Sequence, residues 1–467
     1  MQEIYSLSAT KLIKKIKTKK LSVTEVSSAF INRIEQVNPS LNAVLQFDPE
    51  RILNDAKIAD SIISSGIKIN KLHGLPITIK DACHVKNFIV SKGCPGLFKT
   101  PSTYDSTVVA RLKAAGAIIL GLTNTPELLL SYESDNLIYG RTNNPYDLTR
   151  TPGGSSGGEA AIIAAGGSPA GIGSDAGGSI RQPAHYCGIC AHKPTQGLVP
   201  LTGNFPLDSA GIGSHLLTMG PMARNVEDLI LLMSVISGTD QIDPNAPPVI
   251  FKKTIPVNLK SLRIAYFFNN PTDTPPCHDT VKAMSNVIEL LRNEFFSVTK
   301  DYPELLNSVY RLHLETFMFA GDGGQSIRQL FAKLKQDHIS PLSESFLNLA
   351  SQYKFSVTEL RQRLIEVEQF RYGMLRYMEN YDIIISPVTA TPAHFHGETF
   401  ANIRDVGYAI AHNLTGWPVT VVPCGYANNG LPIGIQIIAK PWHDHVCLAV
   451  AMKIQKTLGV FPIPYIK

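Results

Sequence analysis

The sequence lacks the features of a secreted or membrane-spanning chain. No uninterrupted apolar run approaches the ~20 residues that a transmembrane helix needs. The N-terminal segment MQEIYSLSATKLIKKIKTKK has no apolar stretch behind a basic start, so it does not resemble a secretory signal. The seven cysteines are odd in number and scattered, which is typical of reduced thiols. We therefore expect a soluble, cytoplasmic protein without a stable membrane anchor.

Charge of either sign is also scarce. Charged residues make up 17% of the 467 residues, the net charge is +5, and 44% of the residues are hydrophobic. This composition is typical of a globular chain with a large core and does not favour a nucleic-acid partner. The basic run at 11–20 is interpreted as the solvated face of an N-terminal helix. Because no repeat, low-complexity tract or linker interrupts the chain, we predict one domain over residues 1–467.

Helical and strand patterns alternate along the chain. A capping box at Ser22 and Glu25 begins a helix that we expect to end at Pro39. The apolar run at 74–81 is typical of a buried strand, and Lys80 stands at its end. This alternation predicts a mostly parallel α/β sheet. Further strands are predicted at 117–121, 170–173, 263–267, 383–387, 419–423 and 433–438, and further helices at 158–165, 225–236, 281–291 and 356–377 and from 105 or 106.

The stretch 151–193 is unusually rich in glycine and serine. Glycine inside a helix or strand costs ~0.5–1 kcal/mol relative to alanine, so this richness needs a reason. Backbone that approaches a ligand closely, or N–H groups aimed at an anion, would supply one. Ser155 and Ser156 stand inside the first glycine cluster, and Ser179 directly follows the second. Covalent catalysis is the functional interpretation, and a pair of tight buried turns is the alternative.

Three other motifs in this stretch are weaker. The segment 171–176 matches a dinucleotide fingerprint, but no acidic residue follows about 20 residues later to hold a ribose. The GGSSG at 153–157 fits a nucleophile elbow, but a turn and not a strand precedes it. His185, Cys187, Cys190 and His192 have no second cysteine pair, which favours packed core over a zinc site. We therefore expect neither a cofactor nor a metal ion.

A lysine and two serines account for the remaining chemistry. A serine attacks a carbonyl readily only when a base takes its proton, and a lysine kept neutral by desolvation can be that base. Lys80 at the end of an apolar strand fits this role, and Ser179 fits the nucleophile. Ser155 would relay the proton if its backbone is held in a strained form, such as a cis peptide after Gly154. The predicted oxyanion donors are the N–H groups of Ala176, Gly177, Gly178 and Ser179.

These motifs resemble those of the amidase signature family of serine hydrolases. The resemblance rests on GGSSGG at 153–158, GSDAGGSIR at 173–181 and KPT at 193–195. It implies a catalytic triad of Lys80, Ser155 and Ser179, with a cis peptide at the relay serine. It also implies an α/β fold in which helices cover both faces of a large, mixed, mostly parallel twisted β-sheet, with the signature core at about 70–220.

Segments around the signature are similar to the second type of fatty-acid amide hydrolase. They are YESDN at 132–136, IYGRTNNPYD at 138–147, Glu159 and QGLVP at 196–200. The last differs from the Tyr- and Arg-containing continuation in the glutaminase subunit of the tRNA-dependent amidotransferase. The resemblance implies an amidase that hydrolyses a carboxylic amide, with fatty-acyl and aryl amides as candidates, through a Ser179 acyl-enzyme. The alternatives are that glutaminase subunit, with tRNA and a synthetase partner, and a non-catalytic binding protein.

Supporting residues and a substrate pocket are predicted as well. Asp175 and Arg181 are expected to brace the segment 173–181 that carries Ser179, called the nucleophile loop below, by charge-assisted bonds. Ser156 is counted with them as a supporting residue. A looser, aromatic-rich segment at about 300–355 is interpreted as a helical, specificity-bearing insert. We place the acyl pocket among 201–215, 301–353 and 391–402, which interrupt the regular pattern. We expect a monomer or homodimer that binds a small-molecule amide.

Overall fold

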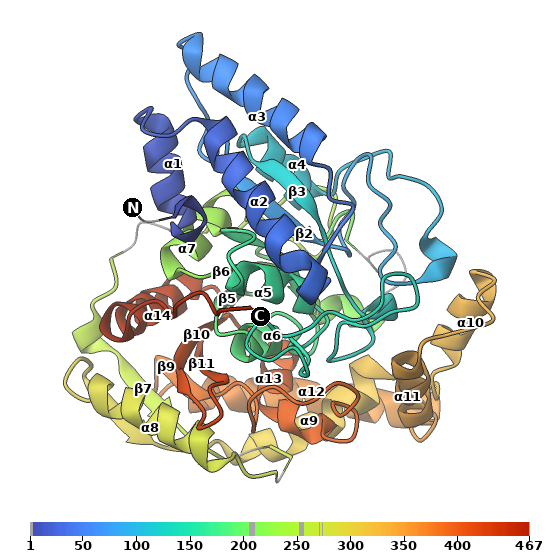
Figure 1. Cartoon of the computed structure of the whole chain (residues 1–467). Coiled ribbons are helices and arrows are strands. Elements are labelled where there is room, and N and C mark those ends of the chain that lie inside the picture. Colours follow the sequence, from blue (N-terminus) through green and yellow to red (C-terminus); the bar gives the residue numbers. More distant parts are fainter. Residues whose placement is uncertain (1–2, 205–210, 252–255, 270, 273, 467) are drawn as a thin grey trace.

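The chain is built around a large β-sheet (Figure 1). The computed structural model describes residues 3–204, 211–251, 256–269, 271–272 and 274–466. Within these residues the sheet has 11 strands, in the order β1-β3-β2-β4-β6-β5-β10-β11-β9-β7-β8. The strands are β1 (Val44–Leu45), β2 (Pro76–Lys80), β3 (Ile118–Thr123), β4 (Ala170–Asp175), β5 (Cys190–Lys193), β6 (Thr218–Ala223), β7 (Arg263–Tyr266), β8 (Ser297–Lys300), β9 (Ile383–Pro387), β10 (Val419–Tyr426) and β11 (Pro432–Ala439).

The α/β class and the mixed sheet are confirmed, but the sheet is not mostly parallel. Parallel pairs occur at β3-β2-β4 and at β9-β7-β8. The other six neighbouring pairs are antiparallel. The prediction fails because β5 and β6, which the sequence pattern did not reveal, enter the middle of the sheet in antiparallel pairs. Gly220 and Pro221 lie inside β6, and both residue types weaken a strand pattern.

Helices pack on both faces of the sheet (Figure 1). Within the described residues, none of them combines the length and the apolarity needed to cross a bilayer. The helices are α1 (Ala9–Lys17), α2 (Val23–Leu41), α3 (Pro49–Ser64), α4 (Thr107–Ala114), α5 (Gly157–Ala164), α6 (Arg181–Tyr186), α7 (Val226–Ile236), α8 (His278–Leu291), α9 (Val309–His313), α10 (Gln325–Lys333), α11 (Pro341–Ala350), α12 (Val357–Tyr377), α13 (Gly407–Leu414) and α14 (Asp444–Leu458).

Local sequence signals set several helix starts. Ser22 and Ser356 each begin a helix in a capping box with the glutamate three residues later. The helix α2 does not end at Pro39 as expected but continues to Leu41. A proline in the last turn forfeits one backbone hydrogen bond, and the helix still closes because Asn42, in the left-handed conformation, donates its N–H to Asn38 O.

The segment between β8 and β9 forms a helical layer beside the sheet. It contains α9, the π-helical turn η8 (Leu314–Met318), α10, α11 and α12. Phe319 stacks on Tyr353 and meets Phe346 edge to face, within a small apolar cluster of its own. Residues 304–350 of this layer, which overlap the predicted insert, are called the helical insert below.

Candidate active site

Lys80 ends β2 and is fully buried. Its Nζ lies 2.7 Å from Ser155 Oγ, 3.0 Å from Ser174 Oγ and 3.3 Å from Ser174 O. Burial lowers the pKa of Lys80 to about 7, although the carboxylates of Asp175 and Glu159 raise it. A substantial fraction of this lysine is therefore neutral near neutral pH.

The three contacts of Lys80 match the valence of a neutral amine. Such an amine has two N–H groups and one lone pair. The carbonyl and hydroxyl oxygens of Ser174 can accept both N–H groups. The lone pair then faces the hydroxyl of Ser155, so this arrangement can withdraw a proton from Ser155.

Ser155 and Ser179 come from two loops that are joined to each other. The peptide bond between Gly154 and Ser155 is cis, as the family resemblance implies. Ser156 N donates to Ser179 O at 3.1 Å, and Ser156 Oγ donates to Ser174 O at 3.3 Å. Ser155 and Ser179 line the same cavity. The structure thus brings the predicted base, relay and nucleophile to one place, with Ser156 connecting their loops.

Glycines in the first cluster are explained by close approach of backbone to backbone. A Cβ on Gly154 would lie 2.6 Å from Ser131 O, and one on Gly158 would lie 2.5 Å from Asn124 N. Neither position could hold a side chain without moving the neighbouring chain. The glycines therefore let the loop of Ser155 pass against neighbouring backbone and let α5 approach the end of β3.

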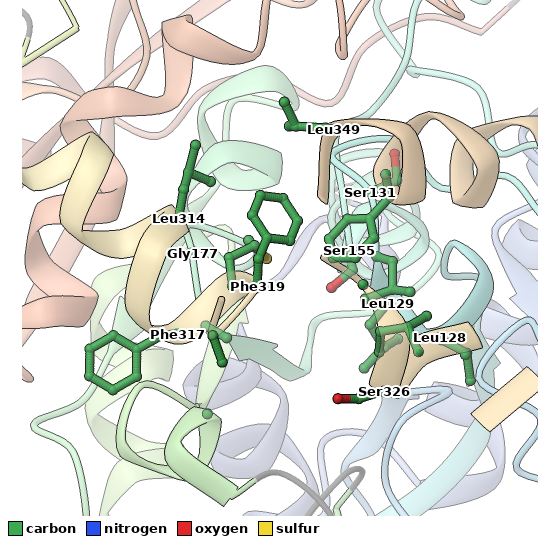
Figure 2. Close-up of a pocket in the computed structure, with 18 of the residues that line it drawn as sticks. Leu128, Leu129, Ser131, Ser155, Gly177, Leu314, Phe317, Phe319, Ser326 and Leu349 are labelled. Carbon is green, nitrogen blue, oxygen red and sulfur yellow. The ribbon is translucent and has the colours of Figure 1, made fainter. Parts of the chain in front are cut away.

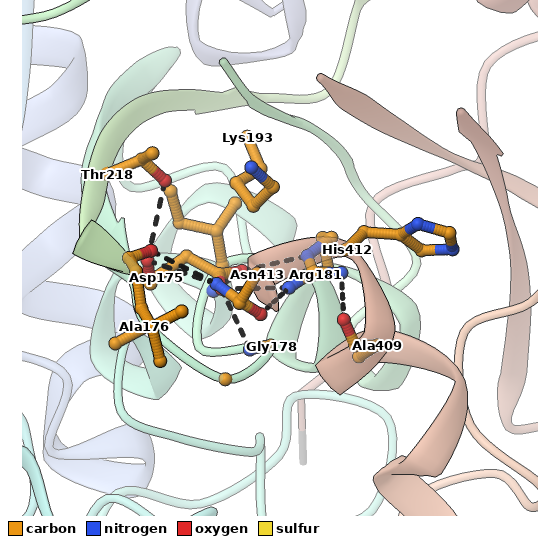
Figure 3. A network of polar contacts seen from close by, with 12 residues as sticks. Asp175, Ala176, Gly178, Arg181, Lys193, Thr218, Ala409, His412 and Asn413 are labelled. Carbon is orange, nitrogen blue, oxygen red and sulfur yellow. Dashed lines mark hydrogen bonds and ion pairs between the residues drawn. The ribbon is translucent and has the colours of Figure 1, made fainter. Parts of the chain in front are cut away.

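A buried ion pair braces the nucleophile loop (Figure 3). Arg181 Nε and Nη2 each donate to the Asp175 carboxylate at 2.9 Å, and both side chains are fully buried. The same carboxylate accepts the N–H of Ile180 at 3.1 Å and an amide N–H of Asn413 at 2.9 Å. Burial raises the pKa of Asp175, but the Arg181 guanidinium and these bonds outweigh it and hold the pKa well below its usual range. The bracing role predicted for Asp175 and Arg181 agrees with these contacts.

The set of predicted oxyanion donors is reduced by one. Gly178 N–H donates to Asp175 Oδ1 at 2.8 Å, so it is engaged in bracing the loop. Gly178 also has a φ of +112°, a conformation that favours glycine. The other predicted donors, Ala176, Gly177 and Ser179, line the cavity and remain candidates for binding an oxyanion.

A mostly apolar cavity of about 540 Å³ opens beside the serines (Figure 2). Leu314 and Phe317 of the helical insert lie on one side of the cavity. Leu128 and Leu129, which the sequence did not point to, lie on the opposite side. All three predicted pocket segments contribute lining residues, although 205–210 of the first segment lie outside the described residues.

A second buried carboxylate lies near Lys80. Glu159 in α5 accepts hydrogen bonds from the hydroxyls of Thr78 and Thr123, the latter at 2.8 Å. Burial raises the pKa of Glu159 to about 7, while the two hydroxyls and Lys80 lower it. Thr78 and Lys80 point to the same face of β2, because alternate residues of a strand share a face. Glu159 therefore acts electrostatically on Lys80 without being bonded to it.

The histidines and cysteines at 185–192 are buried in the core. His192 lies between Thr420 Oγ1 at 2.9 Å and Asp444 Oδ1 at 3.1 Å, and His185 contacts the backbone of Gly434. In the described part of the chain, no three His, Cys, Asp or Glu side chains are grouped as a metal ion would need. Residues 147–152, before the first glycine cluster, form no strand, so the nucleophile-elbow context is absent there.

Besides Leu128 and Leu129, sequence reasoning missed four side chains that contact Lys80 or the nucleophile loop. Ser174 and Tyr132 stand inside segments that carried the family resemblance, so their positions, though not their contacts, could have been noticed. Asn413 and His313 had no local signal, because each reaches the nucleophile loop from a helix more than 100 residues further along the chain.

The fold and the site together define a hydrolase that has an α/β architecture but lacks the nucleophile-elbow context at its first glycine cluster. A buried lysine of lowered pKa contacts a serine, and a second serine shares the cavity. The family model described as Amidase matches residues 25–448, so the chain belongs to the amidase signature family and is an amide-hydrolysing enzyme.

Relatives of two kinds match almost the whole chain. Human fatty-acid amide hydrolase 2 is 33% identical over 98% of this chain and 90% of its own length. A glutamyl-tRNA(Gln) amidotransferase subunit of Koribacter versatilis is 29% identical over 98% of this chain and 99% of its own length. A solved structure entitled fatty acid amide hydrolase superposes with a TM-score of 0.86 at 25% identity, covering 99% of this chain and 86% of the other. Sequence identity alone does not choose between the two activities.

Proposed function

We propose that this amidase hydrolyses amides of carboxylic acids with extended hydrocarbon chains, through an acyl-enzyme on Ser179. The observation that carries the proposal is the apolar cavity that contains both Ser155 and Ser179. Its volume of about 540 Å³ lies in the ~300–1,000 Å³ range of small-molecule pockets. Burial of a methylene group stabilises a complex by ~0.8 kcal/mol, so such a cavity favours a long acyl chain over a short one.

The contacts of Lys80 support a proton relay. Neutral Lys80 takes the hydroxyl proton of Ser155 while Ser155 takes that of Ser179, and Ser179 Oγ adds to the amide carbonyl carbon. N–H groups of the nucleophile loop bind the oxyanion. As the C–N bond breaks, the proton returns through Ser155 to the leaving nitrogen, which departs as ammonia or an amine. Water then adds to the Ser179 ester by the same relay, and the acid is released.

The lining of the cavity favours an acyl chain over glutamine. A glutaminase must bind the α-ammonium and α-carboxylate groups of glutamine. Each of these charged groups needs a partner of opposite charge when it is desolvated. Among the described lining residues the charged side chains are Asp322 and Lys333. Asp322 already accepts the N–H groups of Gly324, Gln325 and Ser326, and Lys333 is exposed at the end of α10.

A cytoplasmic location stays a prediction from the cysteine content.

A substrate panel tests this proposal. It contains primary amides of straight-chain acids of increasing length, an aryl acylamide and L-glutamine, with release of ammonia or arylamine as the readout. Ser179→Ala, at the same concentration, supplies the background. We expect kcat/KM to rise by up to roughly fourfold for each added methylene until the cavity is filled, with glutamine among the poorest substrates. Efficient glutamine turnover with no dependence on chain length would instead support the amidotransferase function.

A further inference from the structure

His313 is the last residue of α9, and its imidazole extends from the helical insert to the nucleophile loop. The side chain is fully buried, and Nε2 lies 3.1 Å from Ala176 O. A Cβ built on Gly177 would lie 3.4 Å from His313 Cε1, so the ring packs directly against this part of the loop. His313 is thus a contact between the insert and the backbone that precedes Ser179.

The imidazole is neutral and donates from Nε2. Burial lowers the pKa of His313 to about 4, although its bond to Ala176 raises it. Arg181 lowers this pKa further and Asp175 raises it. Because a carbonyl oxygen can only accept, the ring proton stands on Nε2. Within the described residues Nδ1 has no hydrogen-bond partner, so the hydrogen bond of the ring is the one that Nε2 donates to Ala176 O.

This bond orients a peptide group of the loop. In a trans peptide the C=O and the following N–H point in opposite directions. His313 holds the carbonyl of Ala176 on its own side, so the N–H of Gly177 points away from His313. Within the described part of the chain that N–H meets no acceptor, and Gly177 lines the cavity.

Tyr132 holds the next peptide group in the same way. Its hydroxyl donates to Gly177 O at 2.9 Å, and the N–H of Gly178 on the far side of that peptide donates to Asp175. Two successive carbonyls of the loop are therefore fixed by side chains, one by His313 of the insert and one by Tyr132. Only the Ala176 carbonyl is held from the insert.

The turn that follows His313 forms a wall of the cavity. Leu314, Phe317 and Met318 belong to the π-helical turn η8, and all three line the cavity. Turns of this kind are rare and occur frequently at functional sites. A chain bound in the cavity therefore packs against the turn that directly follows His313.

We infer that His313 is a positioning residue that couples occupancy of the apolar cavity to the oxyanion hole, an inference that rests on the proposed acyl-amide hydrolysis. His313 sets the peptide group whose N–H, that of Gly177, binds the oxyanion. A long acyl chain held against η8 steadies His313 and so raises kcat, whereas a short chain leaves it less restrained. Remote binding energy is used in this way when it improves geometry at the reacting centre.

The test compares three variants with wild type on short-chain and long-chain primary amides. His313→Leu removes the donor, and His313→Gln places an amide N–H at similar reach. His73→Leu removes an equivalent bond, from the buried His73 Nε2 to Ala59 O at 2.9 Å, at a position outside the cavity lining, so it is the matched control. We expect kcat for the long amide to fall ~10²-fold in H313L, the loss typical of one oxyanion donor, with KM little changed. H313Q should recover most of the loss, and H73L should stay near wild type.

Chain-length dependence gives the second readout. In wild type, kcat should rise with acyl length, and in H313L this rise should be lost. Wild-type kcat that is independent of acyl length, equal losses in H313L and H313Q, or full activity in H313L would each overturn the inference. If H313L does not fold, the wild-type length series and H313Q decide.

Two possible failures remain distinguishable. If wild type turns over no amide of the panel, or Ser179→Ala is as active as wild type, the proposed function fails. If Ser179→Ala is inactive while H313L matches wild type, only the role of His313 fails.

Discussion

The nucleophile loop at 173–181 and the helical insert at 304–350 border the same cavity but are held by different forces. The loop is built of small residues, and a buried ion pair and backbone hydrogen bonds fix it. The insert packs aromatic and aliphatic side chains against one another, and its ion pairs lie nearer the surface. Directional bonds hold atoms in place, whereas apolar packing tolerates repacking at constant volume.

We expect this difference to divide the roles of the two regions, so that the loop sets the rate of amide hydrolysis and the insert sets the selectivity for acyl-chain length. Changes in the loop or in its proton relay should lower turnover of all amides alike. Changes in the insert should alter the ranking of amides by chain length. His313 is the exception, because it belongs to the insert and bonds to the loop.

The largest effect is expected from Lys80→Met. Loss of the base should lower kcat/KM by about 10²–10⁴-fold for every amide, without changing their ranking. Lys193→Met is the matched control, because Lys193 is equally buried, burial also lowers its pKa to about 7, and its Nζ donates to Pro194 O. Steady-state kinetics of the folded variants on the amide panel measures both the loss in kcat/KM and the ranking. A ranking by chain length that changes in K80M would contradict the separation of rate from selectivity.

Removal of Arg181 compares the two regions in stability. Arg181→Met leaves a buried carboxylate without its cation, which should cost about 3–5 kcal/mol in urea unfolding at neutral pH. Arg311→Met in the insert removes a half-exposed partner of Glu315 and Glu366 and should cost about 1 kcal/mol or less. Equal costs would mean that the loop is not braced more tightly than the insert.

The cost of Arg181→Met should depend on pH. The native pKa of Asp175 is depressed, so its ion pair contributes stability that is present above the unfolded pKa of ~3.9 and is lost as pH falls through the native value. The unfolded states of wild type and R181M share the same pKa for Asp175, and without Arg181 burial raises the pKa of Asp175 in the folded variant. The difference between the two proteins should therefore shrink as pH falls through that raised value. Unfolding curves at neutral and acid pH measure it.

Filling the cavity should change selectivity. Leu349→Trp adds volume to the insert wall and should lower kcat/KM for the longest amide about tenfold or more, while the shortest amide stays within about twofold. The same substitution at Leu375, an exposed position of α12 outside the lining, is the control. Parallel losses for short and long amides would show that the insert does not select the acyl chain.

The smallest effect is expected in the pH profile. In the proposed relay neutral Lys80 is the base, so kcat/KM should rise with pH through about 7. Glu159→Gln removes a nearby negative charge that raises the pKa of Lys80, so the midpoint should move to lower pH. Glu127→Gln is the control, because Glu127 is buried among Ser340 and Ser343 at the insert. An unchanged midpoint in E159Q would remove Glu159 from the electrostatics of the base.

The same contrast explains what the sequence could reveal. The two glycine clusters are local features, so their spacing pointed to Ser155 and Ser179 as candidates, and the apolar strand pattern pointed to Lys80. Contacts made across the fold leave no such pattern. The antiparallel strand β6 contains Gly220 and Pro221, and the commitment of Gly178 N–H to Asp175 depends on the shape of the loop. Leu128 and Leu129, whose backbone φ is positive, likewise enter the wall through an irregular turn.

The identity of the nucleophile is tested most directly by intact-mass measurement and peptide mapping after exposure to an alkyl fluorophosphonate. One adduct is expected, on Ser179, and Ser179→Ala should neither form it nor hydrolyse amides. A stoichiometric adduct on another residue, or undiminished turnover by Ser179→Ala, would contradict the assignment of Ser179 as the acylated residue.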